Sequence, residues 1–553
     1  MSLFKKKKGF DLYNHEDVMH PERAWEEYCG FLALPMKQYV HIQNRLMEEQ
    51  LRLWCPSGIG RHILQGKDPR TIAEFIHDVP LTTYEDYADI LLARREDMLP
   101  APVVTWVETT WEGGKRPVKA APYTQGMLDA FKRNGKAVFM LASATDWGKY
   151  QIGTSVLSNM APLPYLTGVM GVILDQEFGF RFMPPHKTST TMSFSERTKL
   201  GFKMALNGGV DYFICLGSIS YFMSRKLIES VNGGSGSRGS NPAGSGGGLS
   251  LGAMARILKA RRKASSEGRG LLPKDLFDLR GFVVAGTDNA CYKDDLERLW
   301  GVRPMELFAG TEATLVGVET WNRRDLYFFP DACFYEFLPY DHVRSTDRHL
   351  PTVTIDKVQP GEKYELVITS LRGGAFARYR TGDVYRCTGF GDLADHSVLP
   401  RFSYVDRAPG IIDIAGFTRI TENSIDEVVA LSHLPIRDWC AAKEFHPQTG
   451  HPFPHLYVEM EPDALESTAL SESVIRRHLG IYFNFLDNDY ESLKKILDME
   501  PLQVTFLQHG SFDAFAQDSG RRIHRVNPPA GDVGQLVRAM QGRKPLRFWE
   551  EVR

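Results

Sequence analysis

Phe308-Ala309-Gly310-Thr311-Glu312 opens the stretch that decides the fold, and Arg378-Tyr379-Arg380-Thr381-Gly382-Asp383 closes it. The first segment ends a short β-strand pattern that begins at Met305, and a buried-strand pattern at 282–288 precedes it. Ligands of α/β sheets bind outside the carboxyl ends of the strands. We therefore expect the aromatic ring, the hydroxyl and the carboxylates of this stretch to line a ligand site.

Apolar patterns in the first half of the chain alternate between helix and strand. Residues 15–95 have mostly helical patterns, whereas residues 125–230 alternate amphipathic helices with apolar strands at 139–143 and 213–216. Such alternation predicts an α/β fold with layered sheets and helices. At 553 residues and 43% hydrophobic composition, the chain can bury a large core.

The pattern changes beyond Arg401, which predicts a second domain. We place a large N-terminal domain at residues 1–407 and a small, mobile α+β domain at residues 408–553. Residues 232–248 are rich in glycine and serine and have no apolar period. They predict a flexible loop inside the large domain.

Composition and charge argue against several classes of protein. With a net charge of −2, the chain has no bulk attraction for nucleic acid. Its seven cysteines include no CxxC pair, so we expect neither a zinc site nor a disulfide framework. No window approaches the roughly 18 apolar residues of a membrane span. The lysine run at residues 5–8 leads into no apolar segment, so we expect no signal peptide and a cytoplasmic protein.

A strand–turn–strand pattern at residues 103–119 has the shape of a phosphate loop. Glycines free backbone amides to face an anion, hydroxyls donate to it, and a lysine neutralises it. The spacing does not fit the Walker pattern, so an ordinary surface turn is the alternative. The candidate residues of this turn are Thr109, Thr110, Gly113, Gly114 and Lys115.

Taken in order, these segments resemble the adenylate-forming enzyme superfamily. Within it the chain is most similar to the acyl-acid amido synthetases of the plant auxin-conjugating type and their bacterial relatives. The similarity extends over nearly the whole chain. The motifs that carry it lie at residues 80–87 (PLTTYEDY), 308–312 (FAGTE), 334–339 (FYEFLP), 364–369 (YELVIT), 378–384 (RYRTGDV), 388–390 (TGF) and 510–513 (GSFD).

The resemblance implies a large luciferase-like domain followed by a small domain that moves between half-reactions. It implies an ATP- and Mg2+-dependent ligase that adenylates a carboxylic acid and transfers the acyl group to the amine of an amino acid. One alternative is transfer to coenzyme A, as in phenylacetate–coenzyme A ligases. Another is a nucleotide-binding homologue with weak or no catalysis. Neither nucleic acid nor a membrane is an expected partner.

The resemblance also implies roles for the residues of the opening stretch. Thr311 would bond the α-phosphate beside Gly310, and Glu312 would hold Mg2+. Phe308 would lie against the adenine, where the family usually has tyrosine. Asp383 would accept hydrogen bonds from the ribose hydroxyls. Each carboxylate also has a plainer explanation, since Glu312 can cap a helix and Asp383 can pair with a neighbouring arginine.

Further roles follow from the resemblance for residues outside that stretch. Ala285, Gly286 and Thr287 match the turn that passes the adenine edge. Arg407 lies at the family's interdomain hinge, where an arginine can reach the phosphate or the ribose. Lys119 begins a segment similar to the family's Lys-x-x-Pro-Tyr-Thr. We expect Lys119 and Arg407 to be catalytic together with Thr311 and Glu312.

Two departures from the family pattern stand out. The phosphate loop lacks the Ser-Gly-Thr of the superfamily, and Glu112 adds a negative charge to it. A second candidate loop at residues 142–149 lies too far from the Pro-Tyr-Thr anchor. Near the C-terminus, Asn527 occupies the position of the family's lysine. Arg525 or His524 could supply a cation there, although an arginine fork differs from a lysine point charge.

Overall fold

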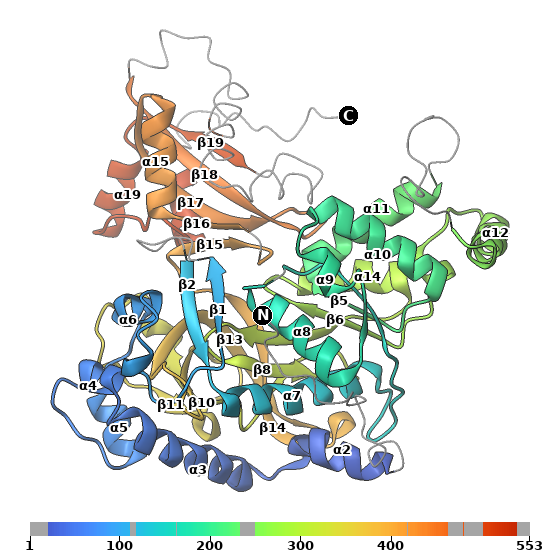
Figure 1. Cartoon of the computed structure of the whole chain (residues 1–553). Helices are drawn as coiled ribbons and strands as arrows, with labels where there is room; N and C mark the ends of the chain where they lie inside the picture. Colours follow the sequence, from blue (N-terminus) through green and yellow to red (C-terminus); the bar gives the residue numbers. More distant parts are fainter. Residues whose placement is uncertain are drawn as a thin grey trace. The chain divides into compact units, whose positions relative to one another are not determined.

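The computed structural model describes residues 20–110, 118–161, 163–232, 249–416, 418–462, 479 and 502–538. The chain divides into two compact units between Asp406 and Arg407. Figure 1 shows the helices and strands of both. A search of the described helices finds none with the length and apolar character needed to cross a membrane.

A mixed sheet of twelve strands organises the described part of the large unit. Its strands, in sheet order, are β11 (Val353–Thr354), β10 (Cys333–Pro339), β12 (Lys363–Ser370), β13 (Tyr379–Asp392), β14 (Ser397–Arg407), β9 (Leu326–Phe328), β8 (Thr314–Glu319), β7 (Met305–Gly310), β6 (Gly281–Ala285), β5 (Tyr212–Leu216), β3 (Ser155–Ser158) and β4 (Arg181–Met183). A separate hairpin joins β1 (Thr105–Thr110) to β2 (Val118–Tyr123).

One half of the large sheet is parallel. Strands β7, β6, β5, β3 and β4 all run in the same direction. They are nearly continuous apolar runs, as expected for strands covered on both faces. Their carboxyl ends therefore meet at one edge of the sheet, where the segments after β6 and β7 lie.

The other half of the sheet is antiparallel and curls back on itself. Four strand-to-strand steps separate β7 from β13 in the sheet order. Nevertheless the ring of Phe308 on β7 lies 5.2 Å from that of Tyr385 on β13. Because sheet twist accumulates from strand to strand, a long sheet can curl until distant strands face each other. This curl brings the two ends of the deciding stretch together.

Helices cover both halves of the sheet. In Figure 1, α10, α11 and α14 surround β5 and β6, and α3 and α5 lie along the antiparallel half. The helices of the large unit are α2 (Pro21–Cys29), α3 (Met36–Trp54), α4 (Gly58–Leu64), α5 (Ile72–Asp78), α6 (Ala88–Leu92), α7 (Gln125–Ser143), α8 (Leu166–Phe178), α9 (His186–Ser189), α10 (Phe194–Gly208), α11 (Gly217–Asn232), α12 (Leu251–Ser266), α13 (Pro273–Leu276) and α14 (Ala290–Trp300).

The strand predicted at residues 139–143 is wrong, because these residues form the last turns of α7. The hydroxyl of Thr124 caps this helix by accepting from the amide of Met127. Its second half, from Ala137 to Ser143, is buried at every position. A helix that is buried all round shows no 3.6-residue period, so its short apolar run looks like a buried strand. The strand predicted at 213–216 is confirmed as β5.

The small unit has its own sheets and helices. Its described elements are β15 (Ile411–Ile414), β16 (Thr418–Thr421), α15 (Glu422–Ser432), β17 (Ile436–Phe445), β18 (Pro452–Met460), β19 (Gln503–Leu507), α19 (Ser511–Ser519) and α20 (Ala530–Arg538). Apolar residues from β17, β18 and α19 form a core of their own, including Cys440, Tyr457 and Phe515. Most of the glycine- and serine-rich loop predicted at 232–248 lies outside the described residues.

Candidate functional site

The turn between β7 and β8 carries the hydroxyl and the first carboxylate of the predicted site. Gly310 pairs with Thr314, so residues 311–313 form the turn, and Thr314 takes a left-handed φ of 72°. Side chains from two other strands hold its backbone. The Tyr123 hydroxyl donates to the Thr311 carbonyl over 2.9 Å, and the Ser370 hydroxyl donates to the Glu312 carbonyl over 2.7 Å. The turn is therefore anchored from both sides.

A lysine, a tyrosine and a carboxylate meet at this turn. Lys119 Nζ lies 3.2 Å from Glu312 Oε1 and 2.9 Å from the Tyr379 hydroxyl. That hydroxyl donates to the same Glu312 oxygen over 2.8 Å. The ammonium also lies over the ring of Tyr84 at 5.4 Å. Residues from β2, β7–β8 and β13, far apart in the sequence, thus share one polar cluster.

Charge and burial act in opposite directions on Glu312. Burial raises the pKa of this carboxyl. The Lys119 ammonium and the Tyr379 hydroxyl lower it by more, so that the pKa lies below its ordinary value. Glu312 is therefore ionised at neutral pH, as a ligand for a hard cation must be.

Strand β13 passes along this hairpin and brings Asp383 toward it. Tyr379 at the start of β13 contacts Glu312, and Tyr385 further along contacts the ring of Phe308. Asp383 lies between these two contact points and is buried. The structure therefore brings the aromatic ring and both carboxylates of the predicted site to the same region.

The turn after β6 lies beside the same edge. Val284 pairs with Glu306, and two further residues along each strand lead to Gly286 and Phe308. Gly286 has a φ of 93°, a conformation that favours glycine. The amide of Asn289 donates to the Gly286 carbonyl over 2.9 Å and holds the turn. Of its flanking residues, Ala285 is half-buried and Thr287 is buried.

The predicted phosphate hairpin has its two strands. Thr109 pairs with Lys119 and Thr110 pairs with Val118, so the turn between them begins directly after the threonines. The other candidates of that turn, Gly113, Gly114 and Lys115, lie outside the described residues, as does Glu112. The hairpin thus places Lys119 both opposite a candidate threonine and against the carboxylate at 312.

The remaining predicted residues belong to the small unit. Arg407 Nε lies 3.3 Å from Oδ2 of Asp413, a fully buried carboxylate that also accepts from Arg419 Nε at 3.0 Å. Asn527 has a left-handed φ of 45°. Its side chain donates to the Ile411 carbonyl and accepts from the Lys443 amide, each over 2.9 Å. Asn527 therefore ties β15 to β17.

Arg525 and His524, the two side chains near Asn527 that were predicted as possible cations, have different surroundings. Arg525 forms ion pairs with Asp426 at 3.1 Å and Asp438 at 3.2 Å, and its guanidinium lies 5.1 Å from the ring of Trp439. The His524 side chain is exposed.

Some residues of the cluster had no predicted role. Tyr84, Tyr123 and Tyr379 all lie inside motifs that the sequence shows, yet their phenols carry no signature of function.

The two arginines of the closing motif are also explained by the structure. Arg378 pairs with Glu336 at 2.8 Å and Arg380 pairs with Glu365 at 2.6 Å, and all four side chains are largely buried. Both glutamates lie in motifs of the same stretch, so these motifs build the fold around the site.

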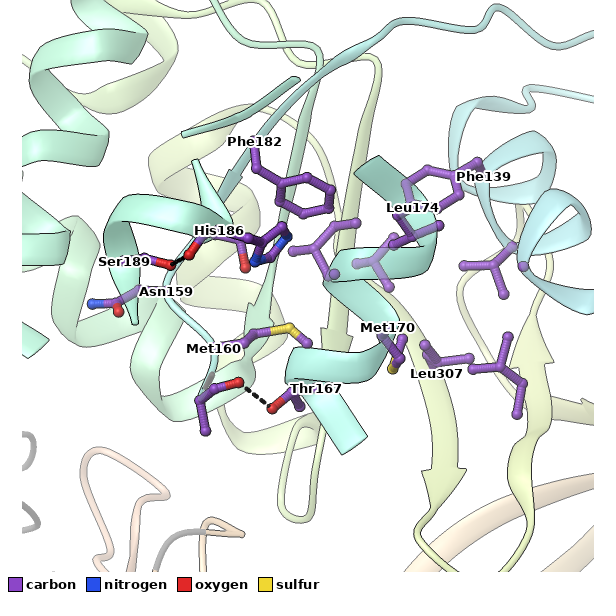
Figure 2. Close-up of a pocket in the computed structure, with 18 of the residues that line it drawn as sticks. Phe139, Asn159, Met160, Thr167, Met170, Leu174, Phe182, His186, Ser189 and Leu307 are labelled. Atoms are coloured by element: carbon purple, nitrogen blue, oxygen red, sulfur yellow. Dashed lines mark hydrogen bonds between the residues drawn. The ribbon is translucent and has the colours of Figure 1, made fainter. Parts of the chain in front are cut away.

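A pocket lined in part by Leu307 and Leu315 lies beside the β7–β8 hairpin. Its empty space, including the open mouth, is about 710 Å3. Five consecutive strands, from β8 to β3, each contribute one residue to its floor, and α7 and α8 form its roof. Figure 2 shows Leu307 and Phe139 on one side of it, and Asn159, His186 and Ser189 on the other. The floor residues are Leu315, Leu307, Val283, Ile214 and Ser158.

The residues present fit a magnesium ion held together with a nucleotide. No cluster of three or more acidic, histidine or cysteine ligands occurs in the described part of the chain. Mg2+ commonly takes one or two carboxylates and completes its shell with phosphate oxygens and water. Ionised Glu312 suits that arrangement as the protein ligand, with Lys119 beside it to neutralise phosphate charge.

Comparisons with known proteins connect this geometry to a family. Residues 326–407 match the GH3 family central domain. The indole-3-acetic acid-amido synthetase GH3.4 of Arabidopsis thaliana is 36% identical over 212 residues. That alignment covers 36% of this chain and 33% of the relative, so it spans about a third of each protein.

Solved structures show the same fold over most of the chain. The AtGH3.15 acyl acid amido synthetase in complex with 2,4-DB matches with a TM-score of 0.51 and 16% identity, over 96% of this chain and 97% of that one. A 2-hydroxyisobutyryl-CoA ligase with 2-HIB-AMP and CoA matches with a TM-score of 0.54 and 14% identity, over 86% and 87%. The expected adenylate-forming fold is confirmed. The chain resembles the GH3 acyl acid amido synthetases, and its residues 326–407 match the central domain of that family.

Proposed function

We propose that this chain is an ATP-dependent ligase that joins a carboxylic acid to the amine of an amino acid. The observation that carries the proposal is the cluster of Lys119, Glu312 and Tyr379 at the turn after β7, in a chain with a GH3 central domain. Adenylation develops charge at the α-phosphate, and preorganised donors aimed at that charge lower the barrier. A half-buried ammonium and a fixed hydroxyl are donors of this kind.

The first half-reaction makes an acyl adenylate. A carboxylate oxygen attacks the α-phosphorus of ATP, and the bond to pyrophosphate breaks. The Thr311 hydroxyl, beside Gly310, donates to the α-phosphate, and Lys119 neutralises phosphate charge. Bound Mg2+ supplies further charge neutralisation, with Glu312 as its protein ligand. The other phosphates are cradled by the turn of the β1–β2 hairpin. The residues of this turn that contact them are Thr109, Thr110, Gly113, Gly114 and Lys115.

The nucleoside occupies the edge between β6 and β13. The ring of Phe308 lies against the adenine, whose edge passes the turn of Ala285, Gly286 and Thr287. The carboxylate of Asp383 accepts from the two ribose hydroxyls, which requires an ionised acceptor with two oxygens.

The second half-reaction makes the amide. The amine nitrogen attacks the acyl carbon, the bond to AMP breaks, and the amine loses a proton. We place the large domain at residues 1–407 and the small domain at 408–553, with Arg407 at the hinge contacting the nucleotide. Movement of a small domain between half-reactions would exchange the residues that surround the adenylate. We expect both to occur in the cytoplasm.

Pyrophosphate exchange into ATP across a panel of carboxylic acids tests the proposal. We expect exchange that requires both Mg2+ and an acid. Absence of exchange with every acid, on folded protein that also fails to bind ATP, would refute it. ATP binding without exchange would instead indicate a nucleotide-binding homologue, for which the anchored side chain of Asn527 is the structural argument. Mass spectrometry of the products then separates amide from coenzyme A thioester.

A further inference from the structure

The pocket beside the β7–β8 hairpin has two chemically different ends. Near the hairpin its wall is apolar, with Leu307, Leu315 and Phe139. The far end holds its titratable side chains, His186 and Arg197. None of the described residues that line the pocket is aspartate, glutamate or lysine. The described wall therefore offers cationic and neutral donors at one end and no anion of its own, although the carboxylate of Asp175 on α8 acts on His186 from outside the lining.

The arginine at the far end is fixed in place but forms no ion pair with any residue that the structure describes. Arg197 Nε donates to Asn159 Oδ1 over 2.7 Å, and Nη1 donates to the Met192 carbonyl over 2.8 Å. Asn159 is held in turn, because its amide donates to the Thr198 hydroxyl over 2.6 Å. No carboxylate in the described ranges lies within ion-pair distance of Arg197. A carboxylate partner strongly stabilises a half-buried guanidinium, because the hydrogen bonds between the two groups are charge-assisted.

A second donor site at this end is also unused. The Nε2 atom of His186 is buried and has no hydrogen-bond partner among the residues that the structure describes. Its ring lies 4.2 Å from that of Phe182 in a tilted arrangement, and a side chain at Gly171 would overlap it, so the ring is held tightly. Buried polar atoms are nearly always paired in folded proteins. An unpaired nitrogen lining a pocket points to a ligand.

The far end lies too distant from the hairpin to hold the reacting carboxylate. Strands β3 and β7 are parallel, and three interstrand spacings separate them, about 14 Å at roughly 4.8 Å each. Asn159 follows the carboxyl end of β3, and Thr311 follows that of β7. Leu307 and Leu315, on the two strands that the Thr311 turn joins, line the near end of the pocket, so a ligand with a carboxyl group at that turn would pass along this apolar wall before it reaches Arg197. A ligand that satisfies both ends needs a polar group at each.

We propose that the acid substrate is an elongated dicarboxylic acid, with one carboxylate at the Thr311 turn and a second, unreacted carboxylate paired with Arg197 and His186. This inference rests on the proposed function, because it assigns the adenylated group to the Thr311 end. The apolar floor and roof bind the hydrocarbon between the two carboxylates. Asn159 positions the guanidinium for the second one.

Matched acids test this assignment. Decanoic acid, decanedioic acid and the monomethyl ester of decanedioic acid are compared in pyrophosphate exchange, with shorter and longer series alongside. We expect kcat/KM for the diacid to exceed that for the monoester by about ten- to a hundredfold, since a hydrogen-bonded charge pair is lost in the ester. Equal values across each series would overturn the inference while leaving the proposed function intact.

Variants connect the preference to the guanidinium. Arg197→Met is expected to abolish the preference for the diacid, measured as the ratio of kcat/KM for the diacid to kcat/KM for the monoester. Arg197→Gln, which keeps a donor for Asn159, should behave in the same way and controls for loss of the local hydrogen bonds. Arg181→Met, at an exposed arginine of β4 outside the pocket lining, should keep the preference. An unchanged preference in both Arg197 variants contradicts the proposal.

A binding measurement keeps the inference separate from catalysis. Calorimetric titration with decanedioate and its monomethyl ester is carried out on the full chain and on Arg197→Met. Tighter binding of the diacid that disappears in the variant supports the pocket assignment even if no acid supports exchange. Equal binding of the two acids would refute it. Absence of exchange with every acid bears on the proposed function alone.

Discussion

The ammonium of Lys119 lies 3.2 Å from a carboxylate oxygen of Glu312, although 193 positions separate them in the sequence. The contact joins the hairpin that follows the candidate phosphate turn to the candidate magnesium ligand. It also explains why Glu312 remains ionised despite its burial. A nucleotide bound between these groups would meet a cation and an anion that already face each other.

Removal of the ammonium should affect the first half-reaction. In Lys119→Met, we expect pyrophosphate exchange to fall by about two orders of magnitude, since a preorganised charge at the phosphate is lost. The loss should appear mainly in kcat. Lys149→Met removes an exposed lysine that pairs with Asp146 and should leave exchange unchanged. An unaltered rate in Lys119→Met would show that another cation performs this role.

The Tyr379 hydroxyl should contribute less than the lysine but in the same place. Tyr379→Phe removes a donor to Glu312 and a partner of Lys119. Because a hydrogen bond to a charged group contributes about 1.5–3 kcal/mol, we expect exchange to fall roughly tenfold or more. Tyr340→Phe, at an exposed tyrosine, is the matched control. Circular dichroism should show both variants folded, and a full exchange rate in Tyr379→Phe would contradict the assignment.

The buried ion pair of Arg378 and Glu336 should be essential for stability. Arg378 also donates to the Val79 carbonyl over 2.7 Å, so its loss leaves several buried acceptors without partners. We expect Arg378→Met to lower the free energy of unfolding of the large unit by about 3–5 kcal/mol, measured by urea titration. Arg70→Met, which breaks an exposed pair with Asp68, should have no measurable effect. Equal stability of the two variants would show that the buried pair is dispensable.

The burial of His186 predicts a pH dependence of stability. Burial lowers its pKa below the ordinary value, and Asp175 on α8 opposes this effect weakly. In the unfolded chain His186 takes up a proton near pH 6.5, whereas in the folded chain it takes up this proton only at a lower pH. Stability is therefore complete above about pH 6.5 and is lost as the pH falls toward the folded pKa.

Urea unfolding at pH 7.5 and 5.5 measures this effect. The unmodified protein should lose more stability between these values than His186→Gln, by about 1 kcal/mol. His62→Gln, at an exposed histidine of α4, should lose as much as the unmodified protein. The same loss in all three proteins would show that His186 does not control this dependence.

Asn527 should resist conversion to the family's lysine. In Asn527→Lys, the small unit would lose two hydrogen bonds and place a lysine at a left-handed φ. We expect faster hydrogen exchange at the Lys443 amide, which donates to the Asn527 side chain, and no gain in pyrophosphate exchange. Asn527→Gly keeps the backbone conformation and should expose the amide less than the lysine variant. Higher activity of Asn527→Lys would show that the site still accepts the family's residue.

Parts of the candidate site were predictable because the chain itself keeps them together. Phe308, Thr311 and Glu312 are close in sequence, and the alternation of strand and turn around them places them at a sheet edge. The prediction of a strand at residues 139–143 was wrong for the opposite reason. A short apolar run is compatible with a buried helix and with a buried strand. Here burial on all sides of the second half of α7 removed the helical period that would distinguish them.

The sequence by itself determined the adenylate-forming fold and the region in which nucleotide-binding chemistry is expected, because motifs and hydrophobic periods are local properties. Only the tertiary structure brought Lys119 and Tyr379 to Glu312, since that meeting depends on the curl of the sheet between β7 and β13. It alone also placed Arg197 and His186 at one end of a pocket whose other end lies beside the β7–β8 hairpin. The physical reason is the same in both cases: such contacts are set by strand order, which no stretch of sequence contains on its own.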